Sequence, residues 1–179
     1  EAGIALVAGV TGLADAEIVE IGRAGGRIPV FLAPNMSIGV ALLARLAREA
    51  ARALPDFDVE IVEMHHRAKK DAPSGTAAAL AREVEEARPG LRRVHGREGL
   101  AGPRDPHEIG IHAIRGGDVV GEHTVVFAGG GERIELTHRA GSRRTFAAGA
   151  LRAARFIAGR APGIYGMDDL LAAGHGEDF

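Results

Sequence analysis

Residues 109–139 read IGIHAIRGGDVVGEHTVVFAGGGERIELTHR, and polar and apolar residues alternate along three runs of this segment. The runs are residues 109–115, 119–127 and 133–139, and such alternation is typical of strands with one buried face. Glycines at 116–117 and 129–131 separate the runs, and glycine readily adopts the positive φ that tight hairpin turns need. The sequence therefore predicts hairpins here and a largely antiparallel second half of the chain.

The N-terminal part of the chain predicts parallel strands instead. Residues 4–10 form an apolar run without polar alternation, as in a strand covered on both faces of a parallel sheet. A short helix at 14–23, the pair Gly25-Gly26 and a second apolar run at 28–33 complete a βαβ unit. Because a doubly covered strand needs neighbours, we expect further sequence upstream of residue 1.

Helices and strands are also predicted between and after these two regions. Apolar residues recur at helical spacing over residues 37–54, and Pro55-Asp56 ends this amphipathic helix. The other predicted elements are a strand at 57–66, helices at 74–87 and 144–159, a loose stretch at 89–106 and a short helical tail near 167–173.

The composition excludes several classes of protein. The chain has 179 residues, 46% of them hydrophobic, and no apolar run approaches the roughly 20 residues that span a bilayer. There is no cysteine, which excludes disulfides and thiolate chemistry. The net charge is −2 and no basic block is interleaved with aromatic residues, so we expect no nucleic-acid partner. We expect a cytoplasmic protein with no membrane partner and no metal.

Lysine is rare and clustered in this sequence. Of the 22 basic residues only Lys69 and Lys70 are lysines, and the rest are arginines. A lysine can release a proton when its surroundings lower its pKa, whereas arginine stays charged near neutral pH. This difference draws attention to the segment around Lys69, although chance in an Arg-biased composition also explains so small a sample.

The end of that segment resembles an anion-binding site. Ser74, Gly75 and Thr76 open a helix, where unpaired amides and the helix dipole favour a carboxylate or phosphate. Gly75 would let a ligand approach the backbone. A simple N-cap explains the same residues, and the local pattern alone favours the cap.

His65 and Lys69 form a candidate proton-transfer pair. In an extended chain their α-carbons would be about 13 Å apart, so they share a substrate only if the loop curls back. Alternation along the strand places His65 and His66 on opposite faces, which argues against a shared metal. Asp71 either balances Lys69 or shapes the turn, and Asp-Ala-Pro favours the turn.

The run EMHHRAKKDAPSGTA at residues 63–77 resembles the signature of the 4-hydroxy-tetrahydrodipicolinate reductases (dihydrodipicolinate reductases). The resemblance continues through VAGVTG at 7–12, APNMSIGV at 33–40, GREG at 96–99, IGIHAIRGGDVVGEHTVVFAGGGERIELTH at 109–138 and RRTFAAGALRAARF at 143–156. It implies an oxidoreductase of lysine and diaminopimelate biosynthesis that transfers a hydride from NADH or NADPH to a cyclic dicarboxylate. It also implies a homotetramer.

The resemblance assigns roles to matching positions. It implies catalytic roles for His65, as general acid or base, and for Lys69, as proton donor. The substrate carboxylates would be held by His66, Ser74, Gly75 and Thr76. The cofactor would contact Gly9, Val10, Thr11, Ala33, Pro34, Asn35 and Met36, and also Arg143 and Phe146. The family's glycine-rich phosphate turn is missing, because no GxGxxG spacing occurs among the 26 glycines.

The resulting fold prediction is α/β with two domains. Residues 1–36 and 143–179 would be the C-terminal part of a Rossmann-like dinucleotide-binding domain. Residues 37–142 would form an α+β domain for substrate binding and tetramerisation, with a mixed, largely antiparallel sheet. Two alternatives remain: a non-catalytic module for ligand binding or oligomerisation, and a two-domain dehydrogenase acting on another substrate.

Overall fold

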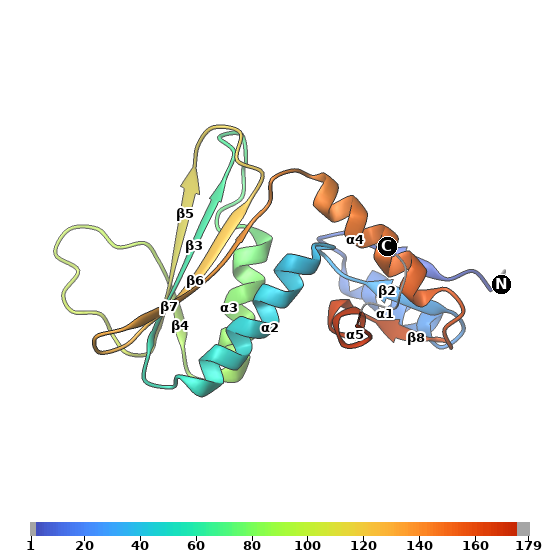
Figure 1. Cartoon of the computed structure of the whole chain (residues 1–179), viewed down its shortest axis with the longest axis horizontal. Helices are drawn as coiled ribbons and strands as arrows, with labels where there is room; N and C mark the ends of the chain where they lie inside the picture. The colour runs from blue at the N-terminus through green and yellow to red at the C-terminus, as the bar shows by residue number, and fades with distance from the viewer. Residues whose placement is uncertain (1–2, 175–179) are drawn as a thin grey trace. The chain divides into compact units, whose positions relative to one another are not determined.

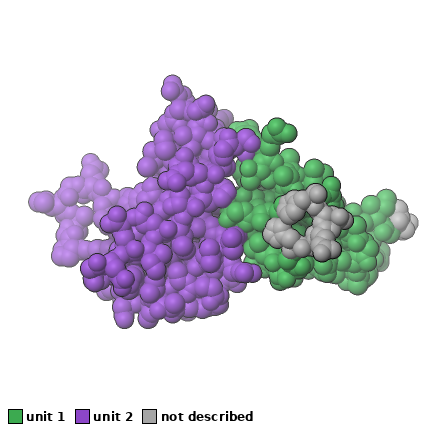
Figure 2. Space-filling model, in the orientation of Figure 1, with its two compact units in different colours: residues 1–41, 143–179 green, residues 42–142 purple. Residues whose placement is uncertain are grey.

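The computed structural model describes residues 3–174 and divides into two compact units (Figure 1, Figure 2). Unit 1 comprises Glu1–Ala41 and Arg143–Phe179, and unit 2 comprises Leu42–Ser142. Among the described residues, no helix has the length and apolar character required to cross a membrane. The same residues contain no group of three or more acidic or histidine side chains arranged to hold a metal ion.

Unit 1 is a small parallel sheet with helices packed on it. The strands β1 (Leu6–Ala8), β2 (Pro29–Leu32) and β8 (Gly163–Tyr165) lie in the order β1-β2-β8. The helices are α1 (Asp15–Gly25), α4 (Arg144–Ile157) and α5 (Met167–Ala172). Its buried core consists of Phe31, Ala33, Met36, Ala153 and Ile157. The predicted βαβ unit is confirmed, with α1 joining β1 to β2.

Two features of unit 1 differ from the sequence prediction. β1 pairs only with β2, and only one of its faces is covered: Val7 packs on the core, whereas Leu6 is 41% exposed. Among the described residues β1 is therefore covered on one face, whereas the apolar run predicted cover on both faces together with further sequence upstream of residue 1. Strand β8 was also not predicted, since its three residues follow a Pro-Gly turn and show no alternation.

Unit 2 is built on a five-stranded mixed sheet in the order β4-β5-β3-β6-β7. The strands are β3 (Asp58–His65), β4 (Arg92–His95), β5 (Glu108–Arg115), β6 (Glu122–Ala128) and β7 (Arg133–Arg139). The central strand β3 is parallel to β5 and antiparallel to β6. β4 is parallel to β5, and β7 is antiparallel to β6. The predicted α/β class with a mixed sheet is confirmed.

One of the predicted hairpins is wrong. β5 and β6 are not neighbours, because β3 lies between them. The Gly116 N–H donates to the His65 carbonyl, and the Arg67 N–H donates to the Gly117 carbonyl. The two glycines therefore hydrogen bond to the segment at the end of β3, and the chain passes this end on its way from β5 to β6. The second hairpin is confirmed: Gly131 has a φ of 88° between the paired strands β6 and β7.

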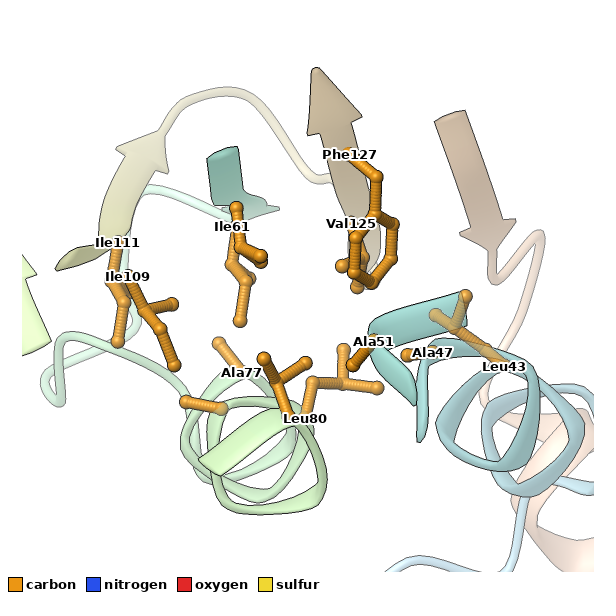
Figure 3. Packing of buried hydrophobic residues seen from close by; sticks show 13 residues of the cluster. Leu43, Ala47, Ala51, Ile61, Ala77, Leu80, Ile109, Ile111, Val125 and Phe127 are labelled. Carbon is orange, nitrogen blue, oxygen red and sulfur yellow. The ribbon is translucent and has the colours of Figure 1, made fainter. Parts of the chain in front are cut away.

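Two helices cover one face of this sheet. α2 (Ile38–Ala53) and α3 (Gly75–Ala87) pack on β3, β5 and β6, and Figure 3 shows their side chains meeting in one core. Alternate strand residues such as Ile61 and Phe127 point into this core, as the period of two requires. Burying a side chain such as Leu80 contributes about 2–3 kcal/mol.

The other face of β3 carries a carboxylate held by basic residues. Glu60 accepts hydrogen bonds from Arg97, Arg104 and His112, with distances from 2.7 to 3.1 Å. Burial raises the pKa of Glu60, but these donors outweigh it and lower the pKa to about 2. A β-carbon at Gly110 would overlap this carboxylate, so the neighbouring strand needs glycine there. The ion pairs hold the loop between β4 and β5 on the sheet.

Candidate active site

Four polar residues lie together on the helix-covered face of the sheet of unit 2. They are located where β3 and β5 end and β6 begins. Along β3, the buried apolar residues Val59 and Ile61 are followed on the same face by Glu63 and His65. Arg115 of β5 is in register with His65, and His123 of β6 is in register with Glu63. The core face thus ends in a polar cluster of Glu63, His65, Arg115 and His123.

Glu63 is at the centre of this cluster and has no exposed surface. Its Oε2 lies 2.6 Å from Nδ1 of His65 and accepts from Nη1 of Arg115 at 2.8 Å. Its Oε1 accepts from Nη2 of Arg115 at 2.7 Å and from the Ser74 N–H at 3.0 Å. Burial raises the pKa of Glu63, but these donors outweigh it and leave the pKa below its ordinary value. Glu63 is therefore a carboxylate near neutral pH.

The contact with Glu63 fixes the orientation of the His65 ring. An ionised carboxylate only accepts hydrogen bonds, so Nδ1 of His65 carries the proton in this pair. Nε2 is then the nitrogen that can exchange a proton with a ligand. It faces Gly121, where a β-carbon would lie 3.0 Å away. The rings of His65 and His123 meet edge to face with centroids 5.2 Å apart.

The loop that carries Lys69 curls back after β3, as a shared site requires. The Lys69 N–H donates to the His66 carbonyl at 3.1 Å, which closes a tight turn directly after His65. Nζ of Lys69 donates to both carboxylate oxygens of Asp71, at 2.7 and 2.8 Å. Nη2 of Arg115 donates to the Asp71 carbonyl at 2.7 Å and so ties the loop to Glu63.

The role of Asp71 differs from the interpretation that the sequence favoured. Its side chain pairs with Lys69, and this hydrogen bond lowers the pKa of Asp71. Residues 72–73 also form a bend, but the Asp71 carboxylate balances the ammonium group of Lys69. Asp-Ala-Pro favours a turn whatever the side chain of Asp71 contacts, so the local sequence could not separate the two roles.

The start of α3 has Ser74 as its N-cap residue, followed by the exposed Gly75. Oγ of Ser74 accepts from the Ala77 N–H at 3.1 Å, which is an N-cap, and it lies 3.0 Å from Nε2 of His123. Ser74 is buried, whereas Gly75 is exposed and a β-carbon there would meet no atom within 4 Å. Ser74 therefore positions the helix, and the space beside Gly75 is where a ligand can approach the first turn.

His123 is a buried neutral imidazole. Burial, and to a smaller extent the nearby His65, lower its pKa to about 4. Its Nε2 contacts Ser74, while its Nδ1 has no hydrogen-bond partner among residues 3–174. A charged ring at this position would be poorly stabilised, so His123 stays neutral beside the other groups.

The residues predicted to contact the cofactor lie in unit 1. Gly9, Val10 and Thr11 follow β1, and residues 33–36 (Ala33, Pro34, Asn35 and Met36) follow the adjacent parallel strand β2. The Ala33 N–H donates to the Ala8 carbonyl at 3.1 Å, and a β-carbon at Gly9 would lie 3.3 Å from Cε of Met36. The two loops are thus neighbours at the carboxyl edge of the sheet, where ligands of open α/β sheets bind.

Arg143 and Phe146 lie at the beginning of α4 in the same unit. Arg143 is the N-cap residue of this helix, and its carbonyl accepts from the Phe146 N–H at 3.2 Å. One turn further on, Gly149 packs against the main chain of Met36. The helix therefore runs beside the loop that follows β2. The predicted catalytic and substrate-binding residues, by contrast, all belong to unit 2.

Sequence reasoning missed Glu63, Arg115, Gly121 and His123. A signal existed for two of them: Glu63 continues the inward face of Val59 and Ile61, and His123 continues that of Val125 and Phe127. Polar residues that interrupt a buried face require partners, which makes them candidates for a site. Arg115 and Gly121 gave no comparable signal, because their places depend on strand order.

Comparisons with known proteins identify relatives of this chain. A family model described as dihydrodipicolinate reductase, C-terminus, matches residues 39–171. The 4-hydroxy-tetrahydrodipicolinate reductases of Thiobacillus denitrificans and Alkalilimnicola ehrlichii are 55% and 56% identical to the chain. Both alignments cover 94% of the chain, which spans 65% of the length of these relatives.

A solved structure is also similar. It is the dipicolinate-bound dihydrodipicolinate reductase from Paenisporosarcina sp. TG-14, with a TM-score of 0.76 and 30% sequence identity. The match covers 93% of the chain and 64% of that structure's chain.

Proposed function

Because the chain belongs to the dihydrodipicolinate reductase family, we propose that it forms most of a 4-hydroxy-tetrahydrodipicolinate reductase. The reaction would be the NADH- or NADPH-dependent reduction of 4-hydroxy-tetrahydrodipicolinate to tetrahydrodipicolinate in diaminopimelate and lysine biosynthesis. The observation that carries this proposal is the cluster in unit 2, where His65, the curled loop of Lys69 and the start of α3 are tied to one buried carboxylate. Such a cluster suits a small anionic substrate that must receive a proton.

The substrate would be bound through its carboxylates. The Paenisporosarcina relative is described as binding dipicolinate, a planar ring with two carboxylates. In this chain we assign His66, Ser74, Gly75 and Thr76 to the carboxylate-binding end. The exposed backbone at Gly75 offers amides at a helix start, and Ser74 holds that helix start in place. The ammonium group of Lys69 would supply a further charge-assisted hydrogen bond.

The substrate must first lose its 4-hydroxyl group as water, and reduction of the resulting unsaturated ring then adds one hydride and one proton. A bound nicotinamide supplies the hydride. We assign proton delivery to Lys69, and the general acid or base role to Nε2 of His65. Both side chains are mostly shielded, 19% and 11% exposed, so that a bound ligand would complete the exclusion of water.

The residues of unit 1 fit the nicotinamide end of such a cofactor. Two adjacent loops, 9–11 and 33–36, lie at the carboxyl edge of parallel strands, and Gly9 packs closely against the Met36 side chain. Arg143 and Phe146 would lie near the same ligand. We propose that unit 1 is the remainder of a Rossmann-like dinucleotide-binding domain and that unit 2 binds substrate. We further propose a cytoplasmic homotetramer without membrane or nucleic-acid partners.

Two measurements test the function. The first is binding of dipicolinate to the 179-residue chain, followed by NMR or calorimetry, with Lys69→Ala and His65→Ala as variants. The second is oxidation of NADH or NADPH by a full-length version, in which the Thiobacillus denitrificans relative supplies the part that the alignment leaves uncovered. We expect turnover of 4-hydroxy-tetrahydrodipicolinate that falls by about 100-fold or more in either variant.

Other outcomes would favour the alternatives. A folded full-length protein that binds cofactor but does not reduce this substrate would indicate a dehydrogenase for another substrate. Binding of dipicolinate without any turnover would indicate a ligand-binding module.

A further inference from the structure

We propose that Glu63 is the positioning residue that holds the groups of this site in one arrangement: Nδ1 of His65, the amide of Ser74 and, through Arg115, the loop of Lys69. This inference rests on the proposed function and adds a residue that the sequence analysis did not single out. Each oxygen of Glu63 accepts two hydrogen bonds, at distances between 2.6 and 3.0 Å. The carboxylate is thus saturated and cannot itself bind a ligand.

A buried charge at this position is costly for a role in stability alone. The preceding inward-facing positions of β3 are Val59 and Ile61, which fill the core without a desolvation cost. A buried ion pair rarely stabilises a fold more than apolar residues of similar volume would. The four hydrogen bonds of Glu63 instead come from His65, from the Ser74 amide and from Arg115, which in turn donates to the Asp71 carbonyl in the loop of Lys69.

The charge of Glu63 also selects the tautomer of His65. A carboxylate requires a proton on Nδ1 and so leaves Nε2 to exchange protons with a ligand. A Gln side chain has one acceptor and one donor group, so Glu63→Gln cannot satisfy all four donors. If its oxygen takes the bonds from Ser74 and Arg115, its NH₂ group faces Nδ1 of His65. That nitrogen must then accept, and the proton moves to Nε2.

The same strand offers a matched control on its other face. Glu60 is also a partly buried carboxylate that lies 2.7 Å from a histidine nitrogen, Nε2 of His112, and is paired with arginines. Its contacts include no residue assigned to the site. Glu60→Gln therefore reports what the loss of a paired carboxylate on β3 does to folding, without touching His65.

The test has a spectroscopic arm and a kinetic arm. The 179-residue chain, with ¹⁵N-labelled histidine, is compared as wild type, Glu63→Gln, Glu63→Asp and Glu60→Gln by ¹H–¹⁵N correlation of the imidazole nitrogens. We expect His65 to carry its proton on Nδ1 in the wild type and in Glu60→Gln, and on Nε2 in Glu63→Gln. In the full-length version, kcat should fall about 100-fold or more in Glu63→Gln.

Glu63→Asp keeps the charge, so this variant tests the role of Glu63 if Glu63→Gln does not fold. The shorter side chain should retain the Nδ1 proton with a weaker hydrogen bond and lower kcat about tenfold. The proposal is overturned if the tautomer of His65 is the same in Glu63→Gln as in the wild type. It is also overturned if kcat falls no further in the Glu63 variants than in Glu60→Gln. A wild type without turnover overturns the proposed function and this inference together, whereas an active wild type that is insensitive to Glu63 overturns this inference alone.

Discussion

Nε2 of His123 lies 3.0 Å from Oγ of Ser74, so a histidine with 4% exposed surface is hydrogen bonded to the residue that begins α3. The bond joins the beginning of β6 to the helix start at which we place the substrate. Burial keeps the imidazole neutral by lowering its pKa to about 4. The geometry of the helix start therefore depends on the protonation state of His123.

This dependence predicts a loss of stability in mild acid. The pKa of His123 is about 4 in the folded chain and near 6.5 when unfolded, so the unfolded state binds the proton more tightly. The contribution of the neutral ring to the free energy of unfolding is fully present above pH 6.5. It is lost as the pH falls toward 4, and the loss amounts to about 3 kcal/mol in total. Urea unfolding at pH 7.5, 6 and 5 should show a shallower pH dependence in His123→Gln than in the wild type.

The exposed residue His107 provides the control for this experiment. His107→Gln should leave the pH dependence unchanged. Equal slopes for the wild type and His123→Gln would show that the buried ring does not govern acid stability.

Replacing Gly75 should separate stability from ligand binding. A β-carbon there meets no atom within 4 Å, and alanine is favoured over glycine in a helix, so Gly75→Ala should gain up to about 0.5 kcal/mol. The same methyl group would occupy the space through which a carboxylate reaches the first turn of α3. We expect the affinity for dipicolinate to fall at least about tenfold, as measured by calorimetry. Gly22→Ala in α1, where a β-carbon also meets no atom within 4 Å, should gain stability without changing the affinity.

Gly121→Ala should disturb His65 with little effect on the fold. The added β-carbon would lie 3.0 Å from Nε2 of His65, which is closer than ordinary packing allows. It would displace the ring and disturb the contact between Nδ1 of His65 and Glu63. A displacement of this kind can reduce turnover about 10- to 100-fold. Steady-state kinetics of the full-length version and the imidazole NMR signals of His65 would measure the effect. Unchanged signals would mean that the ring has more room than the structure indicates.

Gly149→Ala should destabilise unit 1. Alanine in a helix interior usually stabilises, but a β-carbon at Gly149 would overlap the main-chain carbonyl of Met36. Because a backbone atom cannot move aside as a flexible side chain can, we expect a loss of about 2–4 kcal/mol. Urea unfolding monitored by the NMR signals of each unit would locate the loss. A stabilised variant would contradict the close packing of α4 on the loop after β2.

The parts of the site that lie close together in sequence could be predicted, and the parts that depend on strand order could not. His65, Lys69 and Ser74 belong to one segment, in which the chain turns directly after His65. Arg115 and His123 reach the same place from β5 and β6. Their positions follow from pairing between distant strands, which local periodicity does not encode.

The local sequence pattern did not reveal the order of the strands in the sheet. Gly116 and Gly117 have the composition of a hairpin turn, yet the turn spans β3, because hydrogen bonds to the end of β3 satisfy its backbone. The stretch at 89–106 is rich in Gly, Pro and Arg, which predicts a loose segment, yet Arg92–His95 within it form β4. Its pairing with β5 decides the structure of this segment instead.

The central position of β3 also sets an order of assembly. A chain that has been synthesised only through β5 already contains His65, Lys69 and the start of α3, but the antiparallel neighbour of β3 has not yet been made. Contacts between segments so distant in sequence form late, since loop closure must precede them. The contacts of His123 with Ser74 and His65 therefore form only when β6 docks, whereas the four hydrogen bonds of Glu63 involve residues that precede β6.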